Sequence, residues 1–151
     1  MSKEVWIIGV DPPCSRCDLA RQRVERLAKE AKSPVHVRHL IYTDQEACEF
    51  GKSIGKELGT AKDVSQRAGV ELDWEHIHTI YENPPSHPED FDIIDGPARL
   101  WSPELDKALR PCQEKAESVG LLMTPIVIVD GQVKHHGSVP SIDQLRSWLI
   151  K

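Results

Sequence analysis

The chain has 151 residues, of which 39% are hydrophobic and 28% are charged, and its formal net charge is −5. This balance is typical of a soluble globular domain and excludes a largely disordered chain. The acidic charge disfavours a nucleic-acid partner, which needs a basic face, and no apolar run in the sequence is long enough to span a bilayer.

The first forty residues predict a strand, a helix and a second strand. Residues 4–10 form a short, nearly continuous apolar run rich in β-branched side chains, which predicts a buried central strand. Two prolines end it, and a helix is predicted from about residue 14 or 15 to residue 31, with Arg16 and Arg23 on its outer face. Residues 35–42 then predict a second strand, parallel to the first in a βαβ unit.

The segment from about residue 43 to residue 120 is predicted to be a mainly helical insertion. Asp44 is a candidate cap for its first helix. The apolar line of that helix comprises Ala47, Phe50, Ile54 and Leu58. Residues 61–68 predict a second, short helix, and Ser102 opens a third, which Pro111 should kink or interrupt.

The last thirty residues predict a β-hairpin followed by a helix. Residues 126–129 are an apolar run that predicts a short strand. An Asp-Gly dipeptide suited to a tight turn follows, and residues 132–136 are predicted to form the returning strand of the hairpin. Ser141 and Gln144 form a capping box, which opens a final amphipathic helix.

The leading candidates for function are Cys14 and Cys17, which lie where the first strand ends and the helix begins. A thiolate at a helix N-terminus is stabilised by free backbone N–H groups and by the helix dipole, so its pKa falls. Cys14, at the exposed tip, is therefore the predicted nucleophile, and Cys17, on the buried face, is the predicted resolving thiol. Arg16 would add positive charge near Cys14.

The placement of this cysteine pair, and a Met123-Thr124-Pro125 segment before the 126–129 strand, resemble the thioredoxin-like superfamily. The likeness covers roughly residues 4–42 and 121–150. It implies an α/β fold in which a βαβ unit and a ββα unit share a central mixed sheet. We therefore expect one thioredoxin-like domain over residues 1–151, with the helical insertion at about 43–120.

The same resemblance implies a substrate-binding corner. In that family a cis-proline faces the cysteines and helps to dock the substrate backbone, and Pro125, preceded by Thr124, matches its position. Pro13, Ser15 and Arg16 flank the cysteines and are also expected to contact substrate.

The chain departs from the family pattern in three places. Pro13 stands where thioredoxins proper carry an aromatic residue, and residues 5–10 lack their buried acid, so proton transfer to Cys17 would need another group or water. The long insertion resembles the helical domain in disulfide oxidases of the bacterial envelope. Those proteins are exported, whereas this N-terminus lacks a secretion signal, so we expect a cytoplasmic protein.

The predicted activity is thiol–disulfide exchange with a protein or small-molecule disulfide, recharged by an upstream reductant. It needs no cofactor, because the two sulfurs carry the electrons. The direction of electron flow and the oligomeric state stay open. Two alternatives use the same cysteines: a protein that binds a soft metal, and an interaction module that the disulfide switches.

The remaining cysteines and the histidines are not predicted to belong to the functional site. Cys112 falls on an apolar helix face and is expected to be packed in the core, although a second disulfide with Cys48 is an alternative. A zinc or iron–sulfur site built from all four cysteines matches no familiar ligand spacing, and we predict no metal ligands. The histidines are expected to be solvated; those considered are His76, His78, His87, His135 and His136.

Overall fold

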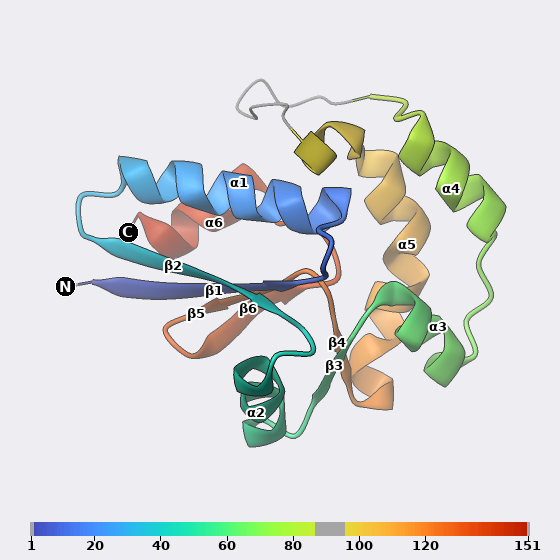
Figure 1. The fold of residues 1–151 in the computed structure, drawn as a ribbon, viewed down its shortest axis with the longest axis horizontal. Coiled ribbons are helices and arrows are strands. Elements are labelled where there is room, and N and C mark those ends of the chain that lie inside the picture. The colour runs from blue at the N-terminus through green and yellow to red at the C-terminus, as the bar shows by residue number, and fades with distance from the viewer. Residues whose placement is uncertain (1, 87–95, 151) are drawn as a thin grey trace.

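A four-stranded mixed sheet forms the centre of the computed structural model, which describes residues 2–86 and 96–150 (Figure 1). Its strands are β1 (Lys3–Gly9), β2 (Val35–Ile41), β5 (Ile126–Val129) and β6 (Gln132–His136). Their order in the sheet is β2-β1-β5-β6, with β1 parallel to β2 and antiparallel to β5, and β5 antiparallel to β6. The predicted thioredoxin-like architecture, a βαβ unit joined to a ββα unit, is confirmed.

Two helices, α1 (Ser15–Glu30) and α6 (Ile142–Leu149), cover one face of this sheet (Figure 1). They bury a core that includes Val5, Ile7, Val24, Leu27, Val127 and Leu145. The predicted capping box opens α6: Ser141 Oγ accepts from the Gln144 N–H at 3.1 Å, and Gln144 Oε1 accepts from the Ser141 N–H at 2.9 Å. The ββα unit is therefore stabilised both locally and by burial.

The opposite face carries α2 (Gln45–Ser53), which is shorter than the sequence predicts. The chain turns at Gly55, whose positive φ of 72° suits glycine, and Ile54 is 43% exposed. Leu58, predicted on the helix, instead lies in β3 (Glu57–Gly59), which pairs in parallel with β4 (Leu121–Met123). Asp44 occupies the N-cap position, but its carboxylate accepts from the Ile41 N–H at 2.8 Å rather than from the helix.

The rest of the insertion is mainly helical, as predicted. Its elements are α3 (Ala61–Ala68), α4 (Trp74–Glu82), the 3-10 helix η1 (Gly96–Leu100), α5 (Pro103–Ala116) and the 3-10 helix η2 (Glu117–Val119). They pack around a core that includes Val64, Ile77, Leu105 and Leu109 and that also takes in Leu19 of α1. Pro111 does not interrupt α5, which continues past it to Ala116. Within residues 2–86 and 96–150, no helix has the length and apolar character needed to cross a membrane.

The insertion packs beside the first turns of α1, and this contact corrects the predicted outer face of that helix. Arg16 and Arg23 are 6% and 3% exposed, not solvated. The Arg23 guanidinium lies 5.3 Å from the centre of the Trp101 ring. The carboxylate of Asp18, another buried residue of α1, accepts from the Ala98 N–H of η1 at 3.1 Å. The cysteine end of α1 is thus enclosed between the sheet and the insertion.

Candidate functional site

The cysteine pair occupies the N-terminus of α1. Cys14 is the N-cap residue, and its Sγ accepts from the Cys17 N–H at 3.4 Å. The two sulfur atoms lie 3.2 Å apart, within hydrogen-bonding distance, and both residues are free thiols. Cys14 is partly exposed while Cys17 is completely buried. The structure therefore agrees with the sequence in placing an accessible sulfur before an enclosed one.

The two thiols have pKa values shifted in opposite directions. A hydrogen bond from Cys17 is the main cause that lowers the pKa of Cys14 from 9.0 to about 6. The Arg16 charge and the backbone N–H groups of the helix start act in the same direction, and burial opposes them. The pKa of Cys17 is raised well above its ordinary value, first by its hydrogen bond with Cys14 and then by burial. At neutral pH the pair consists of a Cys14 thiolate and a Cys17 thiol.

A glycine at the end of β1 makes room for the buried sulfur. A Cβ atom at Gly9 would lie 2.9 Å from Cys17 Cβ and 3.1 Å from its Sγ, closer than packed atoms approach. Gly9 is therefore part of the site because α1 and β1 touch there. The sequence pattern does not reveal this residue, since a glycine at the end of a strand does not by itself indicate which distant side chain will lie against it.

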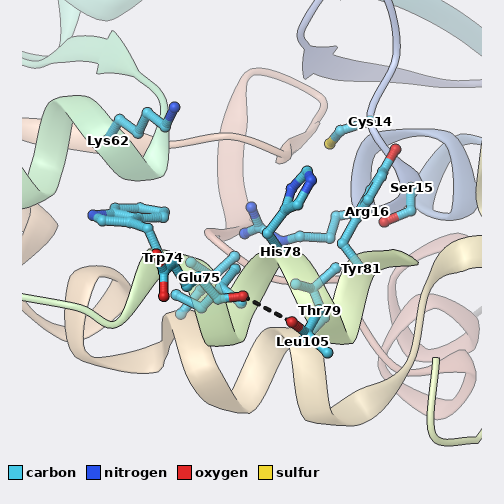
Figure 2. A pocket seen from close by; sticks show the side chains of 12 residues that line it. Cys14, Ser15, Arg16, Lys62, Trp74, Glu75, His78, Thr79, Tyr81 and Leu105 are labelled. Atoms are coloured by element: carbon cyan, nitrogen blue, oxygen red, sulfur yellow. Dashed lines mark hydrogen bonds between the residues drawn. The ribbon is translucent and has the colours of Figure 1, made fainter. Parts of the chain in front are cut away.

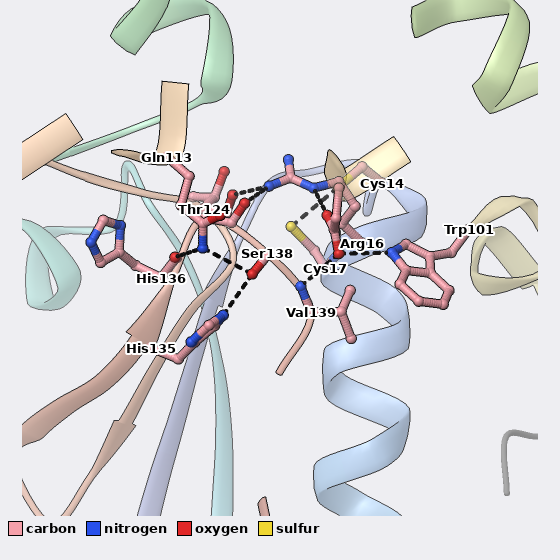
Figure 3. Close-up of polar contacts among 12 residues, drawn as sticks. Cys14, Arg16, Cys17, Trp101, Gln113, Thr124, His135, His136, Ser138 and Val139 are labelled. Carbon is pink, nitrogen blue, oxygen red and sulfur yellow. Dashed lines mark hydrogen bonds and ion pairs between the residues drawn. The ribbon is translucent and has the colours of Figure 1, made fainter. Parts of the chain in front are cut away.

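Arg16, between the cysteines, is the centre of a buried polar network (Figure 3). Its Nε donates to Asp106 Oδ1 of α5 at 2.9 Å, and its Nη2 donates to the carbonyls of Thr124, at 3.1 Å, and Gly137. The other Asp106 oxygen accepts from Trp101 Nε1 at 3.0 Å and from the Val139 N–H at 3.0 Å. One ion pair thus connects the cysteine segment, the insertion and the loop after β6.

The predicted docking corner has the expected cis peptide bond, but its main-chain groups already form hydrogen bonds within the protein. The Thr124–Pro125 peptide bond is cis, as predicted, and Thr124 is 3% exposed. The Thr124 N–H donates to the Gly59 carbonyl of β3 at 2.9 Å, and its carbonyl accepts from Arg16. A substrate carbonyl that paired with the Thr124 N–H would have to displace the hydrogen bond to Gly59.

Cys14 faces a cavity of about 960 Å³ on the side of the insertion (Figure 2). Its lining comprises Cys14, Ser15, Arg16, Lys62, Trp74, Glu75, Ile77, His78, Thr79, Tyr81, Leu105 and Leu109. Of the predicted substrate contacts, Ser15 and Arg16 line this cavity, whereas Pro13, Thr124 and Pro125 are not among its lining residues. The insertion supplies most of the wall.

The sequence pattern does not reveal the part of the lining that α4 supplies. Trp74 and Tyr81 belong to an amphipathic helix, and nothing in a helical pattern shows which distant residue the helix will face. Burial, together with the nearby charge of Cys14, raises the pKa of Tyr81, so its hydroxyl stays protonated and able to donate. Figure 2 shows Tyr81 and His78 on the Cys14 side of the cavity and Lys62 with Trp74 across from them.

The other cysteines do not form a second redox pair in this structure. Cys48 is an exposed free thiol on α2, and Cys112 is a buried free thiol on α5, in the core as predicted. Throughout the described parts of the chain, no group of three or more His, Cys, Asp or Glu side chains could hold a metal ion.

The histidines are not all solvated as predicted. His135 and His136 are partly buried: His135 Nε2 lies 2.6 Å from Ser138 Oγ, and His136 Nδ1 accepts from the Met123 N–H at 3.2 Å. Burial lowers the pKa of both. His78 is exposed and lies 2.8 Å from a Glu82 oxygen, while His87 falls outside the described residues.

Comparison with known proteins supports the same fold. Residues 104–150, from α5 to α6, match a family model described as a thioredoxin domain. Searches of the curated proteins and of the solved structures found no match. The matched segment contains the Thr124–Pro125 step and the β-hairpin but not Cys14 or Cys17, so the role of the cysteines is argued from their own geometry.

Proposed function

We propose that this chain, a member of the thioredoxin-like superfamily, is a thiol–disulfide oxidoreductase that works through Cys14 and Cys17. The observation that carries the proposal is a sulfur–sulfur distance of 3.2 Å between thiols whose pKa values are shifted in opposite directions. Exchange needs one thiolate that attacks and a second thiol that waits, protonated, to resolve the product. The pair at the α1 N-terminus has these properties.

The reaction proceeds in two displacements. The Cys14 thiolate attacks one sulfur of the substrate disulfide, the substrate S–S bond breaks, and the departing thiolate takes the proton of Cys17. The Cys17 thiolate then attacks Cys14 Sγ, and the second substrate sulfur leaves as a thiolate. Two electrons have passed from the protein to the substrate, and a dithiol reductant must return them.

The proposed reaction requires a source of electrons that reduces the protein after each cycle. The Cys14/Cys17 dithiol acts repeatedly as a reductant only if an upstream donor reduces the protein disulfide after each cycle, as in the reducing cytoplasm. No organic cofactor enters either displacement, because the sulfurs themselves carry the electrons. A metal-binding role has less support, since the described residues bring no third ligand to the two cysteines.

The test is a redox titration of the metal-free protein against glutathione or dithiothreitol, with free thiols as the readout. We expect one two-electron transition, lost in both Cys14→Ser and Cys17→Ser and retained in Cys48→Ser as the matched control. The midpoint would separate a reductant from an oxidant. If no disulfide forms between Cys14 and Cys17 at any redox potential of the buffer, the proposal fails.

A second candidate is an interaction module in which the disulfide switches the insertion. The buried contact between Arg16 and Asp106 favours it, because a change at the cysteines reaches α5 through one ion pair. Hydrogen exchange of the reduced and oxidised proteins would test it. A large change of protection in α4 and α5, with little turnover of disulfides, would support the switch over the enzyme.

A further inference from the structure

The cavity beside Cys14 has the reacting sulfur on one side and a cation on another. Trp74, Ile77, Leu105 and Leu109 provide apolar walls between them. We propose that the substrate is a small disulfide whose apolar body carries an anionic group away from its sulfurs, held between Cys14 and Lys62. This inference rests on the proposed exchange activity and names its substrate class.

The occupied docking corner argues against an extended protein segment. A peptide that pairs with a protein edge needs free main-chain groups there. The Thr124 N–H donates to the Gly59 carbonyl and Arg16 already donates to the Thr124 carbonyl, so a peptide could pair with this N–H only after its internal hydrogen bond is broken. The approach to Cys14 instead passes through a concave space of about 960 Å³, a size typical of sites that enclose small molecules.

The Lys62 ammonium favours an anionic group at its end of the cavity, against the opposing charge of the Glu75 carboxylate in the same lining. The Lys62 ammonium lies 5.8 Å from the centre of the Trp74 ring, and no carboxylate pairs with it among residues 2–86 and 96–150. The other charged groups of the wall are Glu75, His78 and Arg16. His78 already contacts Glu82, and Arg16 is paired with Asp106, so Lys62 is the cation of this wall available to a carboxylate.

A buried hydroxyl at the Cys14 side gives an independent indication of a ligand. Ser15 is completely buried and lines the cavity, and within the described structure its Oγ has no hydrogen-bond partner. A buried hydroxyl without a partner is costly, and a rotation of the Ser15 side chain toward the cavity would let a polar atom of the substrate satisfy it. In Figure 2 Ser15 lies beside Cys14 and Arg16, across the cavity from Lys62 and Trp74.

The reaction with such a substrate follows the two displacements above. The thiolate of Cys14 opens the substrate disulfide, Cys17 closes the protein disulfide, and the substrate leaves as a dithiol after it has gained two electrons and two protons. The second proton comes from water. The anionic group takes no part in the chemistry and only orients the sulfurs.

Lipoate and lipoamide are matched probes, because both carry a cyclic disulfide on the same apolar chain and differ in their charged or neutral end. The exchange rate constant would be measured with each, in both directions, by following the absorbance of the dithiolane ring. We expect lipoate to react faster. Lys62→Met should lower the rate with lipoate about two- to fivefold, the range of a partly exposed ion pair, and leave lipoamide unchanged.

Two further variants complete the test. Lys29→Met, which removes an exposed charge from the far end of α1, should change neither rate. Trp74→Ala should slow both probes about tenfold, because it removes apolar wall, with folding verified by the melting temperature.

The outcomes separate this inference from the exchange activity itself. Equal rates for lipoate and lipoamide in the wild-type protein, or an unchanged ratio in Lys62→Met, would overturn the anionic substrate. Faster reaction with the disulfides of insulin than with lipoate, insensitive to Trp74→Ala, would overturn the small-substrate class. In all these cases the redox titration would still show the two-electron transition of Cys14 and Cys17. If that transition were absent, the proposed function itself would fail.

Discussion

Arg16 Nε lies 2.9 Å from Asp106 Oδ1, in an ion pair whose side chains are 7% and 9% exposed. The two residues are ninety positions apart in the sequence, one between the cysteines and the other on α5. Through this pair the insertion helps to hold the segment that carries the two cysteines. It also brings a fixed positive charge to the Cys14 thiolate.

The first prediction concerns that ion pair. Arg16→Met should destabilise the reduced protein by about 3–5 kcal/mol, because it leaves the Asp106 carboxylate buried without its cation. Urea denaturation measures the loss. Arg16→Met combined with Asp106→Leu should recover part of it, and Arg110→Met, an exposed arginine on α5, is the matched control. A loss below about 1 kcal/mol would show that the pair is not buried in solution.

The second prediction concerns the ionisation of Cys14. The rate of its alkylation should follow a titration with a midpoint near its pKa of about 6. Cys17→Ala should raise this midpoint, since the hydrogen bond from Cys17 is the largest cause that lowers the pKa. Cys112→Ala, which leaves the pair intact, should not move it. A midpoint near 9.0 in the wild-type protein would contradict the assignment of Cys14 as the nucleophile.

The third prediction is a pH dependence of stability in the reduced protein. The pKa of Cys14 is about 6 in the folded chain and close to 9.0 in the unfolded one, so its contribution is complete above pH 9 and is lost as the pH falls toward 6. Between these values the free energy of unfolding should rise by up to about 1.4 kcal/mol per pH unit. The raised pKa of Cys17 acts in the opposite sense, but only above pH 9.

The measurement for this prediction is a series of denaturation curves at several pH values. Cys14→Ala should lack the slope between pH 6 and pH 9, and Cys48→Ser should retain it. The lowered pKa values of His135 and His136 affect all three proteins alike, so they cancel in the comparison. Parallel curves for wild type and Cys14→Ala would rule out the shifted thiol.

The fourth prediction concerns Gly9. Gly9→Ala would place a methyl group 2.9 Å from Cys17 Cβ, so Cys17 or β1 must shift. We expect a destabilisation of about 1–3 kcal/mol, typical of an overpacked contact, together with slower closure of the disulfide. Denaturation and the rate of oxidation by glutathione give the two readouts. A variant that matches wild type in both would show that the contact relaxes freely.

The fifth prediction is a map of thiol accessibility. Under native, reduced conditions a small alkylating reagent should modify Cys14 first and the exposed Cys48 next, as read by mass spectrometry. Cys17 and Cys112 are completely buried and should react only after unfolding. Early modification of Cys112 would mean that α5 does not pack as described.

Much of the fold followed from local patterns in the sequence. The strands at residues 126–129 and 132–136, the short helix at residues 61–68 and the capping box of the last helix all lie where their patterns predict. These elements depend on the periodicity of neighbouring side chains and on turn residues, which a single sequence contains. The cysteine pair was found for the same reason, because a strand end and a helix start adjoin in the chain.

The surroundings of the cysteine pair depend on contacts between segments that lie far apart in the sequence. Helical spacing placed Arg16 outside, yet it is buried, since the partner that covers it is Asp106 on a helix of the insertion. The cavity wall, the β3–β4 pairing and the closed docking corner arise from contacts between segments far apart in sequence. The sequence alone therefore determined the local elements and the place of the cysteine pair at the start of α1. Only tertiary packing decided what surrounds the pair, because burial belongs to the contact between two surfaces and not to either segment.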